Sequence, residues 1–469
     1  MLKDKPRLYS KNDLDDEPRK QNYIGYLESS DLTGEVKITI GEDSLLLSTV
    51  FNQTAVKYAD ITNIKLAEYS VSVITPSRMF KLNRLGADCD WFFRDLYNAY
   101  NRKVLKALFV QGSVILETSG EYVITGKNKQ STGTGVIQLY QNCLCILPPD
   151  KNARRIPLSF ISDLKQDQYT LTLTLASNES ISLSKLGYDT DTLLDKLTTQ
   201  MLYLKENWLS FISALDSSMG MSKAVEAART MPADQAVRLD TISTNFPSLA
   251  KSIKAKIKTS RIADTFELLQ EIGEGKQLLV GIKEKPSAMK DDEKEAGSLV
   301  NTEAEESQPP ESEAHKPEYA IWIIAPSKDQ STAILELALP GEEAAATYIF
   351  QTEGNFNETA QIIDRSLEAV DFRREYITLS QTKLKDGKYN EYLMLIERTP
   401  DLVILRQRFV GRAIHTSLEK WKAEVLKLAN GKTTEKGNQQ ITSFKKYCGT
   451  CGSHLSDNAK YCMECGVKV

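Results

Sequence analysis

The feature that most constrains the fold is a weak internal duplication at a shift of about 100 residues. The first copy runs from VKITIGEDSLLL through YADITNIKLAEYSVSVIT to MFKLNRLGADCDWFFRDLYNAY. The second runs from VIQLYQNCLCIL through LSFISDLKQDQYTLTLTL to SISLSKLGYDTDTLLDKLTTQM. Three sets of positions keep their order and nearly constant spacing: Ile61 and Ile161, Tyr69 and Tyr169, and Leu85-Gly86 and Leu186-Gly187. This self-similarity indicates one supersecondary unit used twice.

Each copy has the pattern of a strand meander that ends in a helix. Residues 36–40 and 169–175 alternate with the period of two that is typical of half-buried strands. Turn residues end these runs at 41–43 and 177–179. After the Leu-Gly step, the apolar spacing becomes helical over 90–100 and 191–204.

Several strands closed by one C-terminal helix resemble the pleckstrin-homology-like (PH-like) fold, including the lipid-binding GRAM group. The resemblance covers roughly residues 20–210 and implies two tandem domains, at 20–105 and 106–206, that act as scaffolds for peptides or proteins. Phosphoinositide binding in this family usually relies on Lys and Arg clustered in the first hairpin. The corresponding turns here, 40–44 and 140–142, carry acidic or neutral residues, so anionic-lipid recognition is not supported.

The remaining chain divides by composition. We expect a disordered N-terminus at 1–19, a helical segment at 207–282, an acidic linker at 283–317, an α+β domain at 318–430, a second linker at 431–446 and a terminal metal module at 447–469. The acidic linker is rich in Glu, Ser and Pro and has almost no large apolar residues, so it cannot bury enough surface to fold. The fold class is therefore multidomain α+β.

The helical segment contains a basic amphipathic stretch. Leu249, Ile253 and Ile257 form one apolar line, surrounded by Lys251, Lys254, Lys256, Lys258 and Arg261. Such a helix can lie on a membrane or on a nucleic-acid backbone. We favour a solvated helix packed through its isoleucines, because no bulky aromatic residue flanks the lysines.

In the α+β domain, YAIWIIAP, STAILELAL and ATYIFQTEG predict three strands. Asn357 can cap a helix with Ile362, Ile363, Leu367 and Val370 on its core face. We expect a strand at 376–379 and then mainly helix up to residue 430, interrupted at Pro400.

No residue set in this domain predicts catalysis. His415 is one of 3 histidines in the chain and has no nucleophile elbow or triad context near it, which favours a structural histidine. Six arginines could converge on an anion: Arg365, Arg373, Arg374, Arg406, Arg408 and Arg412. Scattered arginines on helices more commonly remain solvated or pair with acids such as Glu368 and Glu375.

Four of the 7 cysteines lie at the C-terminus, in KKYCGTCGSHLSDNAKYCMECGVKV. Cys448 and Cys451 form one Cys-x-x-Cys pair, and Cys462 and Cys465 form another. Two such pairs supply the four thiolates of a tetrahedral Zn²⁺ site. The tail resembles the short zinc-ribbon modules at the ends of prokaryotic proteins, which implies a closed structural site with no position open for a substrate.

The motif has three other interpretations. A thioredoxin-type redox pair needs a strand-to-helix setting, whereas each pair here lies in a glycine-rich turn. Iron also accepts a tetrahedral sulfur site. His454 would replace a thiolate only if one of the four cysteines did not bind. Zinc is the expected cofactor.

Composition adds little about function. Hydrophobic residues make up 41% and charged residues 26%, and the net charge is -4, so no global basic field indicates a nucleic-acid or membrane binder. The charged start lacks a signal peptide, and no apolar run reaches the ~20 residues of a membrane span, so we expect a soluble cytoplasmic protein. Cys89, Cys143 and Cys145 are expected to pack as small buried hydrophobes.

The leading hypothesis is a non-enzymatic adaptor or scaffold that binds proteins through its PH-like domains. The alternative is nucleic-acid binding by the tail, where Lys445, Lys446, Lys460 and Lys468 accompany Phe444, Tyr447 and Tyr461. A remote alternative is an unrecognised enzyme in residues 318–430.

We predict about one zinc ion per purified chain, bound with an affinity that drives folding of the tail. Elemental analysis after expression with adequate zinc measures the content, and a Cys448→Ser, Cys451→Ser double variant should lose the metal. Zinc-free protein, or unchanged zinc content in the double variant, would contradict the assignment.

Overall fold

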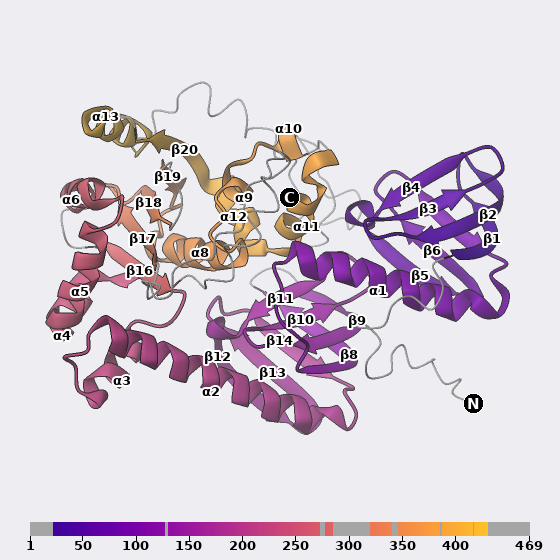
Figure 1. Cartoon of the computed structure of the whole chain (residues 1–469), viewed down its shortest axis with the longest axis horizontal. Coiled ribbons are helices and arrows are strands. Elements are labelled where there is room, and N and C mark those ends of the chain that lie inside the picture. The colour runs from indigo at the N-terminus through magenta and orange to yellow at the C-terminus, as the bar shows by residue number, and fades with distance from the viewer. Residues whose placement is uncertain are drawn as a thin grey trace, which may run out of the picture. The chain divides into compact units, whose positions relative to one another are not determined.

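The structure is a computed structural model that describes residues 22–126, 130–272, 277–284, 319–339, 346–384, 387–415 and 417–429. These residues form a mixed α+β protein with several antiparallel sheets, which confirms the expected class (Figure 1). Contacts group them into two compact units: the described residues up to Lys205 together with Ser366–Gln407, and Glu206–Arg365 together with those from Arg408 onward. The segments expected at 1–19, 431–446 and 447–469 lie outside the described residues.

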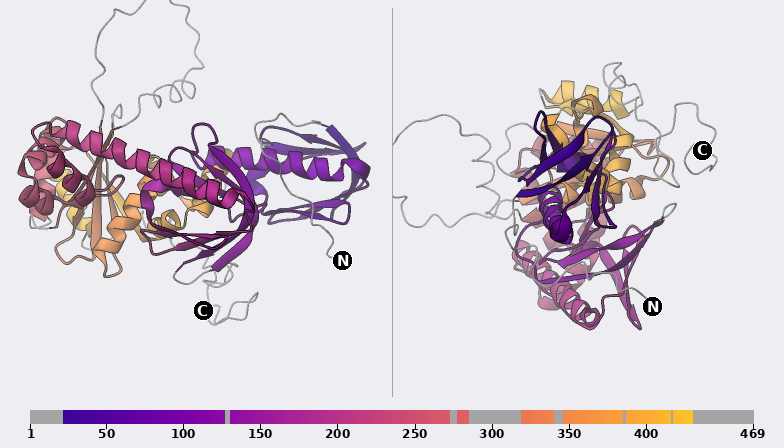
Figure 2. Two further views of the ribbon diagram at one scale, coloured as in Figure 1. Left: turned by 90° about the horizontal axis from the view of Figure 1, so that it is seen from below. Right: turned by 90° about the vertical axis from the view of Figure 1, so that its right-hand side faces the viewer.

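The first unit contains two seven-stranded sheets, the first with strand order β4-β3-β2-β1-β7-β6-β5. Its strands are β1 (Asn22–Glu28), β2 (Thr33–Ile40), β3 (Ser44–Ser48), β4 (Gln53–Lys57), β5 (Asn63–Ala67), β6 (Ser70–Ile74) and β7 (Met79–Asn83), with η1 (Tyr58–Asp60) and η2 (Gly86–Asp88) between elements. Helix α1 (Cys89–Ala107) contacts β2, β5 and β6, so the sheet curves around it (Figure 2).

The second sheet has the same topology, in the order β11-β10-β9-β8-β14-β13-β12. Its strands are β8 (Leu116–Thr125), β9 (Gln130–Leu139), β10 (Cys143–Leu147), β11 (Arg154–Pro157), β12 (Ile161–Asp167), β13 (Thr170–Leu175) and β14 (Ser180–Ser184), with η3 (Leu158–Phe160) before β12. Helix α2 (Asp189–Leu215) follows β14. Every pairing within the two sheets is antiparallel.

The Leu-Gly step that marks the duplication serves the same purpose in both copies. Leu85 and Leu186 are both buried and occupy corresponding places before the helices. The glycines that follow have φ angles of 58° and 63°, in the left-handed region that glycine adopts without steric penalty. The step therefore fills the core and turns the chain into the helix.

The second unit contains a six-stranded antiparallel sheet in the order β15-β16-β17-β18-β19-β20. Its strands are β15 (Val237–Arg238), β16 (Leu279–Glu284), β17 (Tyr319–Pro326), β18 (Thr332–Ala338), β19 (Ala346–Gln351) and β20 (Phe409–Ile414). The associated helices are α3 (Met221–Thr230), α4 (Leu239–Asn245), α5 (Pro247–Lys258), α6 (Ala263–Ile272) and α13 (Leu418–Ala429). Residues of α5, β17 and α13 share one buried core.

The sequence predicts a helical segment at 207–282, but these residues are not uniformly helical. They contribute α3 to α6, but also β15 and most of β16, which pairs with β17 from Leu279↔Ile324 to Glu284↔Tyr319. The partner strand is separated from β16 by residues 285–318. Because this pairing spans so long a segment, no local pattern predicted it.

The segment that follows the sheet also differs from expectation. Its helices are α8 (Phe356–Ala369), α9 (Glu375–Thr378), α10 (Gln381–Leu384), η4 (Gly387–Tyr389), α11 (Asn390–Arg398) and α12 (Pro400–Arg408). The strand expected at 376–379 is wrong, since these residues lie mostly in α9, and β20 occupies positions expected to be helical. The side chain that caps α8 is Asn355, which accepts the N–H of Glu358 at 3.0 Å, rather than Asn357.

The predicted α+β domain at 318–430 is divided between the two units. Ser366–Gln407 groups with the two seven-stranded sheets, while the strands β17 to β20 belong to the other unit. Among the described helices, none has the length and apolar character needed to cross a bilayer.

A buried carboxyl joins α8 to the sheet of the second unit. Asp364 accepts hydrogen bonds from Nε1–H of Trp322 at 2.8 Å and from the backbone N–H of Ala236 at 3.0 Å. Burial raises the pKa of Asp364 to about 8, against the opposing effect of these hydrogen bonds. An aspartate in an unfolded chain has a pKa of about 3.9, so folding raises the proton affinity of this group.

We predict that Asp364 makes the second unit less stable as the pH rises from about 5 to 8, because the folded state binds a proton there that the unfolded state has released. The slope for one proton is at most about 1.4 kcal/mol per pH unit. Urea denaturation across this range should show a flatter profile for Asp364→Asn.

The matched control is Asp240→Asn. Its hydrogen bond with Arg238 lowers the pKa of Asp240, so it does not titrate between pH 5 and 8 and the variant should keep the wild-type slope. Parallel pH profiles for wild type and Asp364→Asn would show that the Asp364 proton makes no contribution.

Candidate functional site

The predicted metal ligands Cys448, Cys451, Cys462 and Cys465 lie outside the described residues. Within the described part of the chain, no group of three or more His, Cys, Asp or Glu side chains is placed to hold a metal ion. The zinc site therefore remains a prediction of the sequence.

The six arginines considered as an anion site are divided between the two units. Arg373, Arg374 and Arg406 belong to the first unit, whereas Arg365, Arg408 and Arg412 belong to the second. The guanidinium of Arg373 lies over the ring of Phe109, at 4.5 Å from its centroid. Arg408 donates to Glu353 at 2.7 Å and to Thr359 at 3.0 Å.

Arg406 is buried, and its guanidinium donates hydrogen bonds to backbone carbonyls. It donates to the carbonyl oxygens of Tyr376, Ile377 and Leu379, the latter two at 2.9 and 2.5 Å. Burial lowers its pKa to about 10, which still leaves the guanidinium charged at neutral pH. The hydrogen bonds satisfy carbonyls at the end of the one-turn helix α9, where intrahelical partners run out.

His415 belongs to a buried polar cluster in the second unit. Its Nε2 lies 3.0 Å from Oε1 of Glu336 and 3.2 Å from Oγ1 of Thr347. Thr347 donates to Glu336 and accepts a hydrogen bond from Nε1–H of Trp421 at 2.5 Å. The threonine hydroxyl is thus used both as donor and as acceptor, and the cluster links β18, β19 and α13.

The most distinctive surface is the outer face of the second sheet, which we call the covered face. Leu144 and Ile146 of β10 point into the sheet's own core, so the alternating residues of that strand point the other way. Neighbouring strands add to this face, whose members are Val136, Gln138, Cys143, Cys145 and Arg155. The first four of these residues are fully buried, so the sheet is covered on both faces at these positions of β9 and β10.

The first sheet shows the contrast. Strand β3 has the same length as β10, but its outward residues Ser44, Leu46 and Ser48 are only half-buried. The sequence already carries this difference, because SLLLS has polar ends whereas CLCIL is apolar throughout. A continuous apolar run is typical of strands with both faces covered.

A buried ion pair joins the covered face to Ser366–Gln407, the helical segment that groups with the two seven-stranded sheets. Arg155 donates two hydrogen bonds to Glu368, at 2.9 and 2.7 Å, and the two side chains are 9% and 8% exposed. Burial disfavours charge on the guanidinium, but attraction to Glu368 is stronger and raises the pKa of Arg155. This bidentate geometry is the strongest form of the contact.

The two thiols of the covered face lie beside this pair. The hydrogen bond with Cys145 lowers the pKa of Cys143, and Arg155 acts in the same direction. Burial raises the pKa of Cys145 well above its ordinary value. Both cysteines are free thiols and are fully buried. Cys89 is also a free thiol and is 2% exposed, so all three pack in the interior as small residues.

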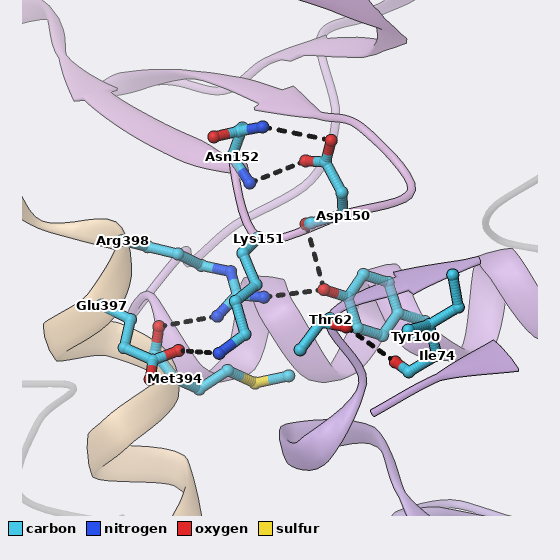
Figure 3. Close-up of polar contacts among 9 residues, drawn as sticks. All are labelled: Thr62, Ile74, Tyr100, Asp150, Lys151, Asn152, Met394, Glu397 and Arg398. Carbon is cyan, nitrogen blue, oxygen red and sulfur yellow. Dashed lines mark hydrogen bonds and ion pairs between the residues drawn. The ribbon is translucent and has the colours of Figure 1, made fainter. Parts of the chain in front are cut away.

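A second set of contacts connects Ser366–Gln407 to helix α1 of the first β domain and to the β10–β11 loop of the second (Figure 3). Arg398 of α11 donates to the hydroxyl of Tyr100 at 2.7 Å, and that hydroxyl donates to the carbonyl of Asp150 at 3.1 Å. Lys151 pairs with Glu397 at 2.8 Å. The Tyr100 side chain therefore lies where α1, the β10–β11 loop and α11 meet.

Lys103, one turn further along α1, adds a partly buried ion pair. Its Nζ lies 2.6 Å from Asp43 and also contacts Glu391 of α11. Burial opposes the charge, yet the two carboxylates together raise the pKa of Lys103. Helix α11 is thus bound by two charged side chains of the β domains, Lys103 and Lys151, and by the hydroxyl of Tyr100.

Sequence reasoning missed this site. The sequence favours a pairing of Glu368 with arginines on its own segment, but its partner is Arg155, 213 residues away. The one available signal was the apolar run of β10, which predicts a cover without identifying it.

Comparison with known proteins adds no assignment, because the chain matches no protein-family model and no curated protein.

We predict that Glu368→Ala destabilises the first unit by about 3–5 kcal/mol, because it leaves the Arg155 guanidinium buried without its partner. Urea denaturation measures the change in unfolding free energy. The control Glu121→Ala removes the exposed partner of Lys185 and should change stability by no more than about 1 kcal/mol. Equal effects of the two variants would refute a stabilising ion pair at Arg155.

Proposed function

We propose that the chain is a non-enzymatic adaptor or scaffold whose two β domains bind protein segments. The observation that carries this proposal is the covered face, on which one β domain holds a helical segment from a distant part of the same chain through Arg155 and Glu368. A face that binds such a segment in cis is chemically suited to bind one in trans.

The PH-like assignment is part of the proposal. It is supported by two sheets of identical strand order, each followed by a helix that begins after a Leu-Gly step. Domains of that fold commonly act as protein scaffolds, as the resemblance in the sequence implied. We further propose that the Cys448, Cys451, Cys462 and Cys465 tail is a zinc ribbon that serves as a small terminal recognition module.

The first β domain supplies the surface for an external partner. Its β3–β4 turn is closed by the Thr49 N–H, which donates to the Asn52 carbonyl at 2.8 Å. Val50 and Phe51 at the tip are 85% and 91% exposed. Two adjacent apolar side chains on an ordered turn are suited to insert into an apolar pocket of a partner.

The corresponding turn of the second β domain is occupied within the chain. In its β10–β11 loop, the carbonyl of Pro149 accepts a hydrogen bond from the N–H of Ile64 at 2.8 Å. The carbonyl of Asp150 accepts one from the hydroxyl of Tyr100. The same loop position thus makes internal contacts in the second β domain and is exposed in the first. This divergence supports an external role for the Val50-Phe51 turn.

The test is affinity purification of the tagged full chain from its native cell. We predict that a Val50→Ser, Phe51→Ser variant loses a partner protein that wild type retains. The matched control is Tyr169→Ser, which removes another exposed side chain, 76% exposed, on the turn before β13. An identical set of proteins with wild type and the double variant would contradict this use of the turn.

A further inference from the structure

Helix α5 presents a row of lysines on the side away from its core. Leu249, Ile253 and Ile257 are buried and anchor the helix to the second unit. Lys251, Lys254 and Lys258 have the spacing i, i+3, i+7, which places them along one face. We call this row the lysine face.

The lysine face has no carboxylate partner among the described residues: none of its three side chains takes part in an ion pair there. The helix itself, PSLAKSIKAKIK, contains no acidic residue. Three positive charges thus lie within two turns of a helix that has no carboxylate of its own, next to a fourth lysine, Lys256, on the other flank.

Lys256 shows where this helix lies in the unit. Its Nζ is 4.7 Å from the ring centroid of Tyr319, the first residue of β17. Tyr319 pairs in turn with Glu284, the last residue of β16. The described chain therefore ends at Glu284 and resumes at Tyr319 at one point of the sheet, directly beside α5.

The connecting residues have the complementary charge. Positions 285–318 contain ten acidic and four basic residues, and the stretch 299–315 contains five glutamates and no Lys or Arg. Its last glutamate, Glu313, is six residues from Tyr319, a reach of about 20 Å when extended. The full width of a helix is only about 10–12 Å, so the stretch can reach the lysine face from its attachment point.

We propose that the lysine face of α5 is a docking site for acidic peptide, and that its occupant is the chain's own stretch 299–315. Attachment beside Tyr319 makes the binding intramolecular, with an effective concentration on the order of millimolar. Exposed charge pairs are screened by salt, so the contact is reversible and open to competition by another polyanion. This inference is independent of the partner proposed for the Val50-Phe51 turn.

The first test is zero-length carbodiimide cross-linking of the full chain, followed by mass spectrometry. We expect Lys251, Lys254 and Lys258 to cross-link to the glutamates of 299–315 several-fold more than the exposed Lys165 and Lys185 do. Changing the five glutamates to Gln, or raising salt to about 0.5 M, should abolish the excess. Uniform cross-linking of all exposed lysines would overturn the proposal.

Two controls fix the identity of the occupant. A variant neutralised at Asp291, Asp292, Glu293 and Glu295 should keep the cross-links, and their loss would assign the site to a different stretch. A mixture of isotopically light and heavy chains distinguishes attachment within a chain from attachment between chains. Mixed-label cross-links would show that a second copy is the occupant and would overturn the intrachain assignment.

A binding measurement gives a second readout. A fluorescent ten-residue oligoglutamate should bind the five-Gln variant several-fold more tightly than wild type, because its site is then free. Adding Lys251→Gln, Lys254→Gln and Lys258→Gln should remove that gain. Equal affinity for wild type and the five-Gln variant would show that the stretch does not occupy the lysine face.

Discussion

The contact on which the first unit depends is the buried pair of Arg155 and Glu368. Transfer of two charges from water into a protein interior is costly, and only close, multiply hydrogen-bonded geometry offsets it. The two N–H···O contacts of 2.9 and 2.7 Å provide that geometry. They join a strand of the second sheet to the end of α8 at the covered face.

This contact explains why two copies of one topology have different surfaces. In the second copy, the covered face carries apolar residues and thiols that would be unfavourable in water. In the first copy, the outward residues of β3 remain half-buried and include two serines. The second β domain thus contributes part of a sheet face to the interior of the unit, whereas the equivalent strand of the first is half-buried and the Val50-Phe51 turn is exposed. This difference is the physical basis of the adaptor proposal.

The sequence predicted what depends on local pattern. Alternation in 36–40 and 169–175 predicted strands that the structure contains, and the Leu-Gly step preceded both helices because glycine alone adopts the required φ without strain. Long-range pairings left no such trace: β16 needs β17 across 285–318, and Arg155 needs Glu368. At 376–379, tertiary contacts overrode β propensity, because Arg406 satisfies the carbonyls of a single buried helical turn. The zinc ligands remain a prediction from motif spacing.

The most direct test of this account is a double-mutant cycle between Arg155→Met and Glu368→Leu, measured by urea denaturation of the full chain. If the pair holds the covered face, each single change leaves one buried charge uncompensated and the double change removes both charges. The account predicts a coupling energy of about 2 kcal/mol or more, with the double variant more stable than the sum of the single effects. Additive effects, with coupling near zero, would contradict it.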